Sequence, residues 1–109
     1  MTSAALAEDR IFKALADPSR RAIFVVLMRG EAAVKDLTAR FDISQPAVSQ
    51  HLAALKDAGL VSDRREGRCA YYRVEPRGMK PLIDWIAHYR AFWTEHVGRL
   101  ERLLEEMDG

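Results

Sequence analysis

The amino-acid sequence predicts a mainly α-helical fold that carries one small β-hairpin. Apolar residues recur at helical spacing along most of its 109 residues, and Pro or Gly marks the ends of several of these segments. Two strand-like runs at 60–65 and 69–74 flank Gly67 and predict the hairpin. A helical pattern from residue 81 to about residue 107 predicts one long final helix. At this length we expect a single domain, residues 1–109.

The composition is that of an ordinary globular protein, with 49% hydrophobic and 30% charged residues. No run of about 18 apolar residues occurs, so we expect no membrane partner. The single cysteine, Cys69, cannot form an internal disulfide. Acidic Glu8 and Asp9 stand where a signal peptide would need an apolar run. These features predict a cytoplasmic protein.

The net charge of +1 conceals an uneven distribution. Residues 18–80 hold 12 Lys and Arg against 7 Asp and Glu, whereas residues 81–109 hold 3 against 6. A basic middle beside an acidic end fits a central nucleic-acid surface. Chance scatter of charge over a solvated surface is the alternative.

The first two predicted helices meet at Asp17-Pro18. The first spans about residues 4–16. Asp17 can cap the second helix, Pro18 suits its first turn, and Gly30 ends it. The apolar set of the first helix is Leu6, Ile11, Phe12 and Leu15, and that of the second is Ala22, Ile23, Val26 and Leu27.

Two short helices joined by a tight turn follow, at about residues 33–58. The first spans about 33–41, and a turn at 42–43 separates it from the second. Ser44 stands where an N-cap belongs, and Pro46 is tolerated in the first turn because its missing N–H would be unpaired there. This arrangement is the helix-turn-helix pattern. The apolar positions are Val34, Leu37 and Phe41 in the first helix and Val48, Leu52 and Leu55 in the second.

The second helix of this pair has an outward side that is small and uncharged. Pro46, Ser49, Gln50 and Ala53 cluster opposite its apolar stripe, where a solvated helix would usually carry Lys and Glu. Gln and Ser are side chains that read base edges in a DNA major groove. We therefore expect DNA contacts from Ser44, Gln45, Ser49 and Gln50. His51 lies beside the stripe, where it either contacts a phosphate or ties the helix to its neighbours.

The hairpin at about residues 60–75 carries a basic tip. Glu66-Gly67-Arg68 forms the predicted turn, and Gly67 is free to adopt positive φ. Arg64, Arg65 and Arg68 crowd this tip. A basic hairpin directly after a helix-turn-helix is interpreted as a wing that reaches phosphates or the minor groove. A plain solvated hairpin is the alternative.

The final helix, at about 81–107, is longer than a small core can cover, roughly 40 Å at 1.5 Å per residue. Its broad apolar face indicates a partner, and a second copy of the chain is the simplest one. The alternative is that the helix folds back onto its own domain. The predicted dimer interface comprises Leu6, Phe12, Leu82, Trp85, Ile86, Tyr89, Trp93, Leu100 and Leu103.

With its elements in this order, the chain resembles the ArsR family of small winged-helix repressors. The motifs that carry the resemblance lie at 12–21, 44–52 and 57–61, together with 65–68 and 71–73 in the hairpin. The resemblance implies a homodimer formed by the first and last helices. It also implies two recognition helices in successive major grooves of a near-palindromic promoter site. A dimer bound at that site would block transcription.

The chain departs from the metal-sensing members of that family. Where arsenic-sensing members carry two cysteines, Ala33 and Lys35 stand here, and neither binds a soft metal. The Asp and His pair of zinc-sensing members is also missing, since Ile86 stands two residues after Asp84. We therefore expect no metal and no cofactor, and His96 is interpreted as a packing residue. Cys69 lies near Arg68, but it lacks a resolving thiol in the same chain.

The leading hypothesis is a sequence-specific, DNA-binding transcriptional regulator that acts as a homodimeric repressor. One alternative is the same repressor released by a metal, an oxidant or a small-molecule inducer. Another is a dimeric protein-interaction module without DNA binding. An enzyme is not expected, because the sequence has no phosphate-binding glycine loop, no nucleophile–base motif and no catalytic metal set.

Overall fold

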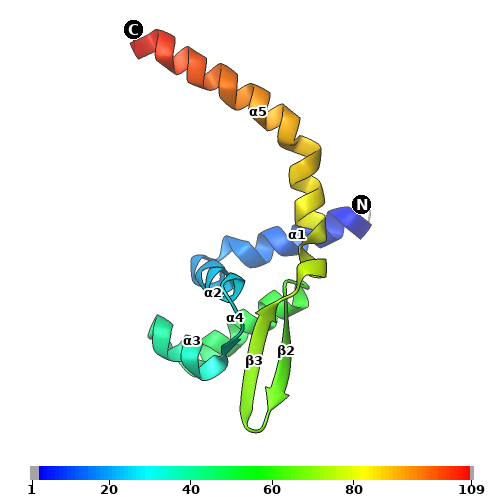
Figure 1. The fold of residues 1–109 in the computed structure, drawn as a ribbon, viewed down its shortest axis with the longest axis vertical. Coiled ribbons are helices and arrows are strands. Elements are labelled where there is room, and N and C mark those ends of the chain that lie inside the picture. The colour runs from blue at the N-terminus through cyan, green and yellow to red at the C-terminus, as the bar shows by residue number, and fades with distance from the viewer. Residues whose placement is uncertain (1–2, 109) are drawn as a thin grey trace.

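The computed structural model describes the backbone of residues 3–108, and the side chains in that range other than those of residues 3–5, 91 and 93. The predicted fold class, mainly helical with a β-hairpin in a winged helix-turn-helix, is confirmed (Figure 1). The elements in order are α1 (Ser3–Ala16), α2 (Pro18–Met28), β1 (Ala32–Ala33), α3 (Val34–Phe41), α4 (Gln45–Asp57), β2 (Val61–Glu66), β3 (Cys69–Val74), the 3₁₀ turn η1 (Pro76–Met79) and α5 (Lys80–Asp108).

The hairpin belongs to a three-stranded antiparallel sheet of order β1-β3-β2. Its turn is tight, since Glu66 pairs with Cys69 and Gly67 has φ 62°. The short strand β1 was not predicted, and Ala33, expected in the third helix, pairs with Tyr71 as part of that strand. Two alanines carry no strand propensity, so β1 exists because β3 offers it a free edge.

Helices α1 to α4 and the base of the sheet enclose one hydrophobic core. The predicted stripe of α4 is confirmed, with Val48, Leu52 and Leu55 all 0% exposed. In α2 the prediction is partly wrong, because Ala22 is exposed and Phe24 is buried instead. The neighbours of α2 cover the side of the helix that carries Ile23 and Phe24, which turns Ala22 outward. The core residues are Ile11, Ala14, Ile23, Phe24, Leu27, Leu37, Val48, Leu52, Leu55, Leu60 and Val61.

Both predicted helix caps are present. The Asp17 carboxylate accepts a hydrogen bond of 3.0 Å from the Arg20 amide at the start of α2. Ser44 Oγ accepts one of 3.2 Å from the Ala47 amide at the start of α4. Between α3 and α4, Asp42 adopts the left-handed conformation with φ 52°, and its amide donates back to the Thr38 carbonyl. These contacts fix the start of α2, the end of α3 and the start of α4.

A close backbone approach joins the end of α4 to the start of α5. Gly59 follows α4 with φ 80°, and Gly78 in η1 lies against it. A Cβ atom at Gly78 would stand 1.5 Å from the Gly59 carbonyl oxygen, so only glycine fits there. The Glu75 amide also donates to the Leu60 carbonyl at 2.9 Å. Together these contacts set the point from which α5 leaves the body.

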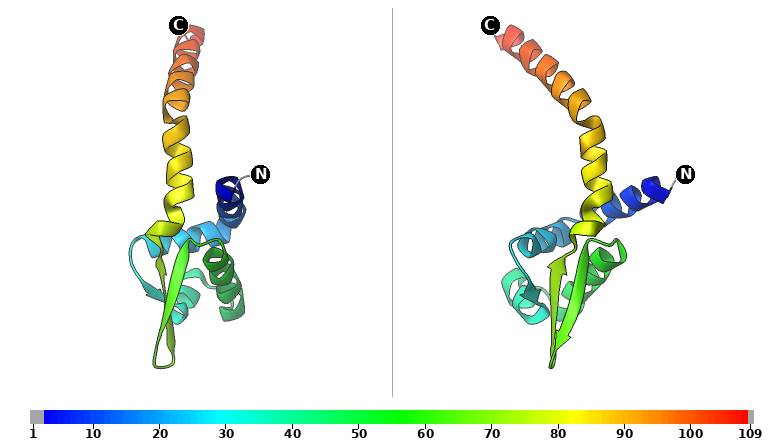
Figure 2. Two further views of the ribbon diagram at one scale, coloured as in Figure 1. Left: turned by 90° about the vertical axis from the view of Figure 1, so that its right-hand side faces the viewer. Right: turned by 45° about the vertical axis from the view of Figure 1, so that its right-hand side comes forward.

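Among the side chains that the structure describes, those of helix α5 that pack against the other elements lie near its start. Leu82 lies against the core, and the Trp85 ring meets the Phe12 ring edge-on at 5.4 Å between centroids. Beyond this point α5 bends and projects away from the other elements (Figures 1 and 2). The molecule is therefore elongated, 61 × 36 × 21 Å. None of the helices in residues 3–108 is long and apolar enough to cross a membrane.

The predicted interface residues are mostly solvent-exposed in the single chain. Leu82 and Trp85 are half-buried, and the side chain of Trp93 lies outside the described residues. Pairing of two chains through this surface stays a prediction. The exposed predicted residues are Leu6, Phe12, Ile86, Tyr89, Leu100 and Leu103, and the α5 residues Ile83, Phe92, Val97, Leu104 and Met107 are exposed beside them.

Candidate nucleic-acid interface

The outward side of α4 is the first part of the candidate interface. Pro46, Ser49, Gln50 and Ala53 are all solvent-exposed, as predicted, while the opposite stripe is buried in the core. None of these four side chains is charged or long and branched, so another surface can approach the helix backbone closely. Because the buried stripe anchors α4 rigidly, the outward side chains start from fixed positions.

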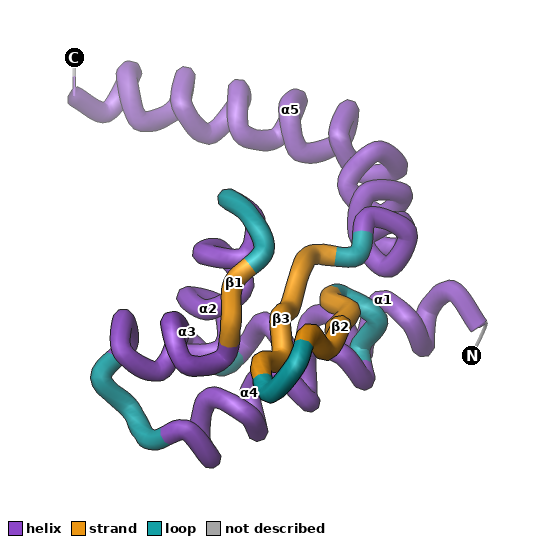
Figure 3. The backbone as a smooth tube through the Cα atoms, turned by 60° about the horizontal axis from the view of Figure 1, so that its bottom comes forward, coloured by secondary structure: helices purple, strands orange, loops and turns teal. Residues whose placement is uncertain are grey.

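The wing is the second part, and it lies beside the start of α4 (Figure 3). A hollow of about 340 Å³ separates the two elements. The side chains of Arg65 and Arg68 border it from the hairpin, and those of Gln45 and Ser49 border it from α4. The structure thus brings together four residues that were predicted separately from helix and hairpin patterns.

Lys35 also borders this hollow, from the first turn of α3. Sequence reasoning treated Lys35 only as a position without a cysteine and missed it as a site residue. The sequence feature that could have indicated Lys35 is the positive net charge of residues 18–80. That net charge does not reveal where an individual Lys or Arg side chain lies in the fold. With Arg65 and Arg68 it places three positive charges around one concave, polar surface.

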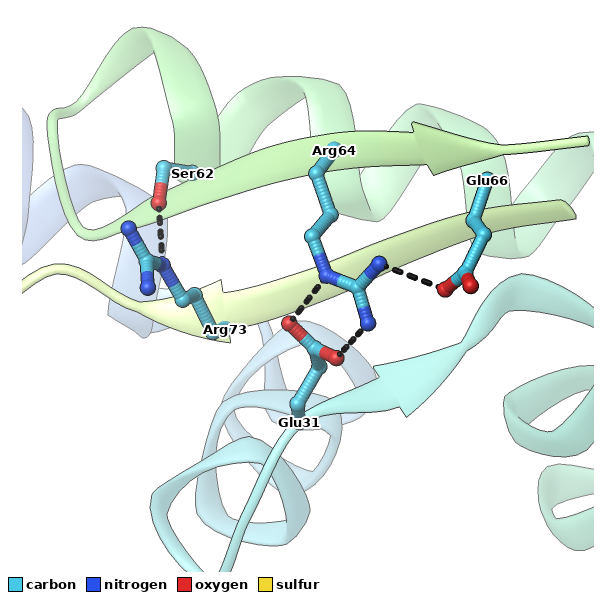
Figure 4. Close-up of polar contacts among 5 residues, drawn as sticks. All are labelled: Glu31, Ser62, Arg64, Glu66 and Arg73. Atoms are coloured by element: carbon cyan, nitrogen blue, oxygen red, sulfur yellow. Dashed lines mark hydrogen bonds and ion pairs between the residues drawn. The ribbon is translucent and has the colours of Figure 1, made fainter.

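Arg64 lies on the other face of the sheet. Successive residues of a strand point to opposite faces, so Arg64 and Arg65 diverge. The Arg64 guanidinium donates to both Glu31 carboxylate oxygens, at 2.6 and 3.1 Å, and to Glu66 at 2.8 Å (Figure 4). It also lies 4.6 Å from the centre of the Tyr71 ring. Arg64 is therefore apart from the other two arginines, and its predicted DNA contact stays a prediction.

These contacts shift the titration of the groups involved. The hydrogen bond from Arg64 lowers the pKa of Glu31 below its usual value. The hydrogen bond to Glu31 has the largest effect in raising the pKa of Arg64 above its usual value, and the hydrogen bond to Glu66 adds to it. Arg73 lies on the same outer face, where its Nε donates to Ser62 Oγ at 3.3 Å.

On the inner face, an ion pair connects the wing to α4. Lys56 Nζ lies 2.8 Å from Asp63 Oδ1. The hydrogen bond from Lys56 lowers the pKa of Asp63, and the same contact raises the pKa of Lys56. The wing is thereby attached to the helix whose outward side it flanks.

His51 occupies a position between the outward side of α4 and the core. It is half-buried, and its Nδ1 is enclosed without a hydrogen-bond partner among the described residues. The hydrogen bond from the Arg20 amide lowers the pKa of Asp17, and His51 adds an electrostatic effect in the same direction. These observations favour the interpretation in which His51 packs α4 toward the start of α2, and its phosphate contact stays a prediction.

The described residues contain no group of three or more His, Cys, Asp and Glu side chains that could hold a metal ion. His96 Nδ1 lies 2.9 Å from the Phe92 carbonyl oxygen, and the two rings stack at 3.9 Å. Both contacts lie within α5 and His96 is exposed in the single chain, so its interpretation as a packing residue stays a prediction. Cys69 is half-buried and borders the hollow beside Arg68.

Known proteins resemble this chain in sequence and in fold. Residues 17–63 match the family described as bacterial regulatory protein, arsR family. Transcriptional repressor SdpR of Bacillus subtilis is 36% identical over 81 residues, which cover 74% of this chain and 90% of SdpR. The HTH-type transcriptional regulator Rv2034 of Mycobacterium tuberculosis is 40% identical over 97 residues, covering 89% of this chain and 88% of Rv2034. The crystal structure of the ArsR family transcriptional regulator RHA00566 superposes with a TM-score of 0.74 and 32% identity, over 86% of this chain and 97% of that one.

Proposed function

Because the chain belongs to the ArsR family of bacterial regulatory proteins, we propose that it represses transcription as a homodimer bound to a near-palindromic promoter site. It is a DNA-binding transcriptional regulator and not an enzyme, as predicted from the sequence. Repression is favoured by the similarity to SdpR, which is named a transcriptional repressor.

One observation carries this proposal: Ser49, on the small polar side of α4, also borders the cationic hollow beside that helix. Ser49 and Gln50 would contact base edges in the major groove. Arg65 and Arg68 would bind the phosphate backbone or the minor groove that flanks it. Base contacts supply sequence preference, and the charged side chains supply affinity that depends on salt.

The start of α4 would lie close to the groove floor. Gln45 borders the hollow, and Lys35 stands across it on α3, where an ammonium suits a phosphate oxygen. Ser44 uses its Oγ to accept the capping hydrogen bond, but its O–H is still available to donate to a phosphate or base. Lys35 is therefore an addition to the contacts expected from the sequence.

The dimer would form through α1 and α5. Phe12 is 43% exposed and lies against Trp85, so the two helices already present a joint apolar surface. Burial of each large apolar side chain would contribute about 1.5–3 kcal/mol as a gross figure. A two-fold dimer places its two α4 helices in major grooves about one helical turn, roughly 34–36 Å, apart. A near-palindromic site follows from that symmetry.

A cytoplasmic location and a small-molecule inducer stay predictions. The alternative of a protein-interaction module without DNA binding is disfavoured by membership in a family of DNA-binding regulators.

The proposal is tested by titrating the protein against the DNA upstream of its own gene and against random duplexes, over a series of salt concentrations. We expect the protein to bind the specific site at least about 10³-fold more tightly than random duplex. Its affinity for DNA should fall steeply as the salt concentration rises. Equal affinity for both DNAs at every salt concentration contradicts a specific binding site for this protein in its own promoter.

A further inference from the structure

We propose that Glu31, Arg64 and Glu66 form a clamp that sets the position of the wing, so that Arg64 is a positioning residue and not a DNA contact. This inference rests on the proposed DNA-binding function. The clamp lies on the outer face of the sheet, away from the outward side of α4 and from the hollow. We call these three residues the wing clamp.

The wing clamp joins β2 to the residue just before β1, and these two strands are not neighbours in the sheet. In the sheet order β1-β3-β2, the middle strand β3 separates β2 from β1. Glu31 directly precedes β1, and Arg64 lies in the middle of β2. The two-pronged Glu31–Arg64 pair therefore crosses over β3, with the Tyr71 ring of that strand beneath the guanidinium. Figure 4 shows Arg64 held between Glu31 and Glu66.

The chemistry of the pair favours positioning. A guanidinium bound by both oxygens of a carboxylate is held in one orientation, because two parallel hydrogen bonds fix its plane. Glu31 connects α2 to β1 and thus to α3, which follows at once. A side chain on the wing is in this way attached to the first helix of the helix-turn-helix.

The charge around Arg64 disfavours a phosphate contact. The two carboxylates give the wing clamp a net charge of −1, and each lies within 2.8 Å of the guanidinium. Arg65 and Arg68 differ, since no carboxylate of the described residues forms an ion pair with either. A phosphate would need to displace a carboxylate from Arg64, whereas Arg65 and Arg68 are ready to bind.

The wing is held from both faces by neighbouring residues of β2. Asp63 binds Lys56 of α4 on the inner face, and Arg64 binds Glu31 on the outer face. A two-stranded hairpin is marginally stable by itself, so such attachments decide where its tip lies. Loss of the outer attachment would let Arg65 and Arg68 move relative to α4.

The test compares Arg64→Met, Glu31→Ala and the double variant in titrations of the specific DNA over a salt series, with Arg65→Ala as the matched control on the opposite face. If the wing clamp positions the wing, each single variant binds the specific DNA about three- to fivefold more weakly than the wild type. That loss of affinity corresponds to the free energy of an exposed but well-formed ion pair. The double variant binds the specific DNA no more weakly than either single variant does. The slope of log affinity against log salt concentration is the same for these variants as for the wild type. Arg65→Ala lowers the magnitude of the slope by about 0.9.

Glu31→Ala is the decisive variant, because removal of an acidic residue near DNA should tighten binding unless its side chain positions the wing. Tighter or unchanged binding by Glu31→Ala overturns the proposal, and so does a slope that falls by about 0.9 in Arg64→Met. An independent measurement without DNA is the ¹⁵N heteronuclear NOE of the Gly67 amide, which should fall in both single variants. An unchanged NOE also overturns the proposal, even where the wild type shows no sequence-specific binding and the proposed function itself fails.

Discussion

Lys56 Nζ of α4 lies 2.8 Å from Asp63 Oδ1 of β2, and this ion pair joins the helix that would read DNA to the wing that would flank it. The two residues are separated by the end of α4 and the tight Gly59 turn, so the contact closes a short loop. Helix and wing are thus presented to a partner as one surface.

Asp63→Asn should lower stability at neutral pH but have little effect in acid. Lys56 holds the native pKa of Asp63 below its ordinary 3.8, so the pair stabilises the fold above that pH. Its contribution is lost as the pH falls through the lowered native pKa. Urea unfolding of both proteins from pH 7 to about pH 2, below the lowered native pKa, measures this. A difference between wild type and variant that stays constant below about pH 4 contradicts the assignment.

Leu52→Ala should destabilise the protein by about 2–5 kcal/mol, because Leu52 is 0% exposed in the core beneath α4. Ala53→Ser on the outward side of the same helix is the control and should change stability by less than about 0.5 kcal/mol. Denaturant unfolding of both variants at one fixed protein concentration gives both values, so that any contribution of dimerisation is the same in each. Equal effects of the two substitutions would mean that the faces of α4 are assigned wrongly.

Gly78→Ala should cost about 2 kcal/mol or more, since its new Cβ would stand 1.5 Å from the Gly59 carbonyl oxygen and the backbone would need to move. Gly98 in α5 is the matched control, because nothing lies within 4 Å of a Cβ there. Gly98→Ala should stabilise the helix by up to about 1 kcal/mol. Thermal unfolding separates the two, and a neutral Gly78→Ala would show that η1 does not need this close approach.

Leu103→Glu should shift the protein from dimer to monomer. Leu103 is 52% exposed in the single chain, and a carboxylate placed in an apolar interface loses its hydration without gaining a partner. Arg102→Glu, one residue earlier, introduces the same side chain beside the stripe and should leave the dimer intact. Sedimentation velocity of both variants measures the change. A wild type that sediments as a monomer at micromolar concentration excludes the proposed interface.

The local parts of this structure could be predicted from the sequence. Asp17 and Ser44 mark helix starts by bonding to amides three residues later, and the α4 stripe follows from helical spacing alone. Each of these features depends on residues that are close in sequence, so its physics is contained in a short segment. The hairpin was predicted for the same reason.

Features that depend on distant residues could not be predicted. The orientation of Arg64 depends on Glu31, which lies 33 residues earlier, and on the register of β2. Strand β1 forms only because β3 is beside it, and Gly78 is required only because Gly59 lies against it. Lys35 joined the candidate site through the fold, which turns the start of α3 toward the wing.

The most direct test of the central claim is selection of binding sites from random duplex DNA by the wild type and by Gln50→Ala. The wild type should enrich a near-palindrome whose half-sites lie about one helical turn apart. Gln50→Ala should still bind DNA but lose preference at the same position of each half-site, a change of about 1–3 kcal/mol for the favoured base. No enriched sequence for the wild type, or an identical preference in Gln50→Ala, would contradict the claim that the outward side of α4 reads DNA.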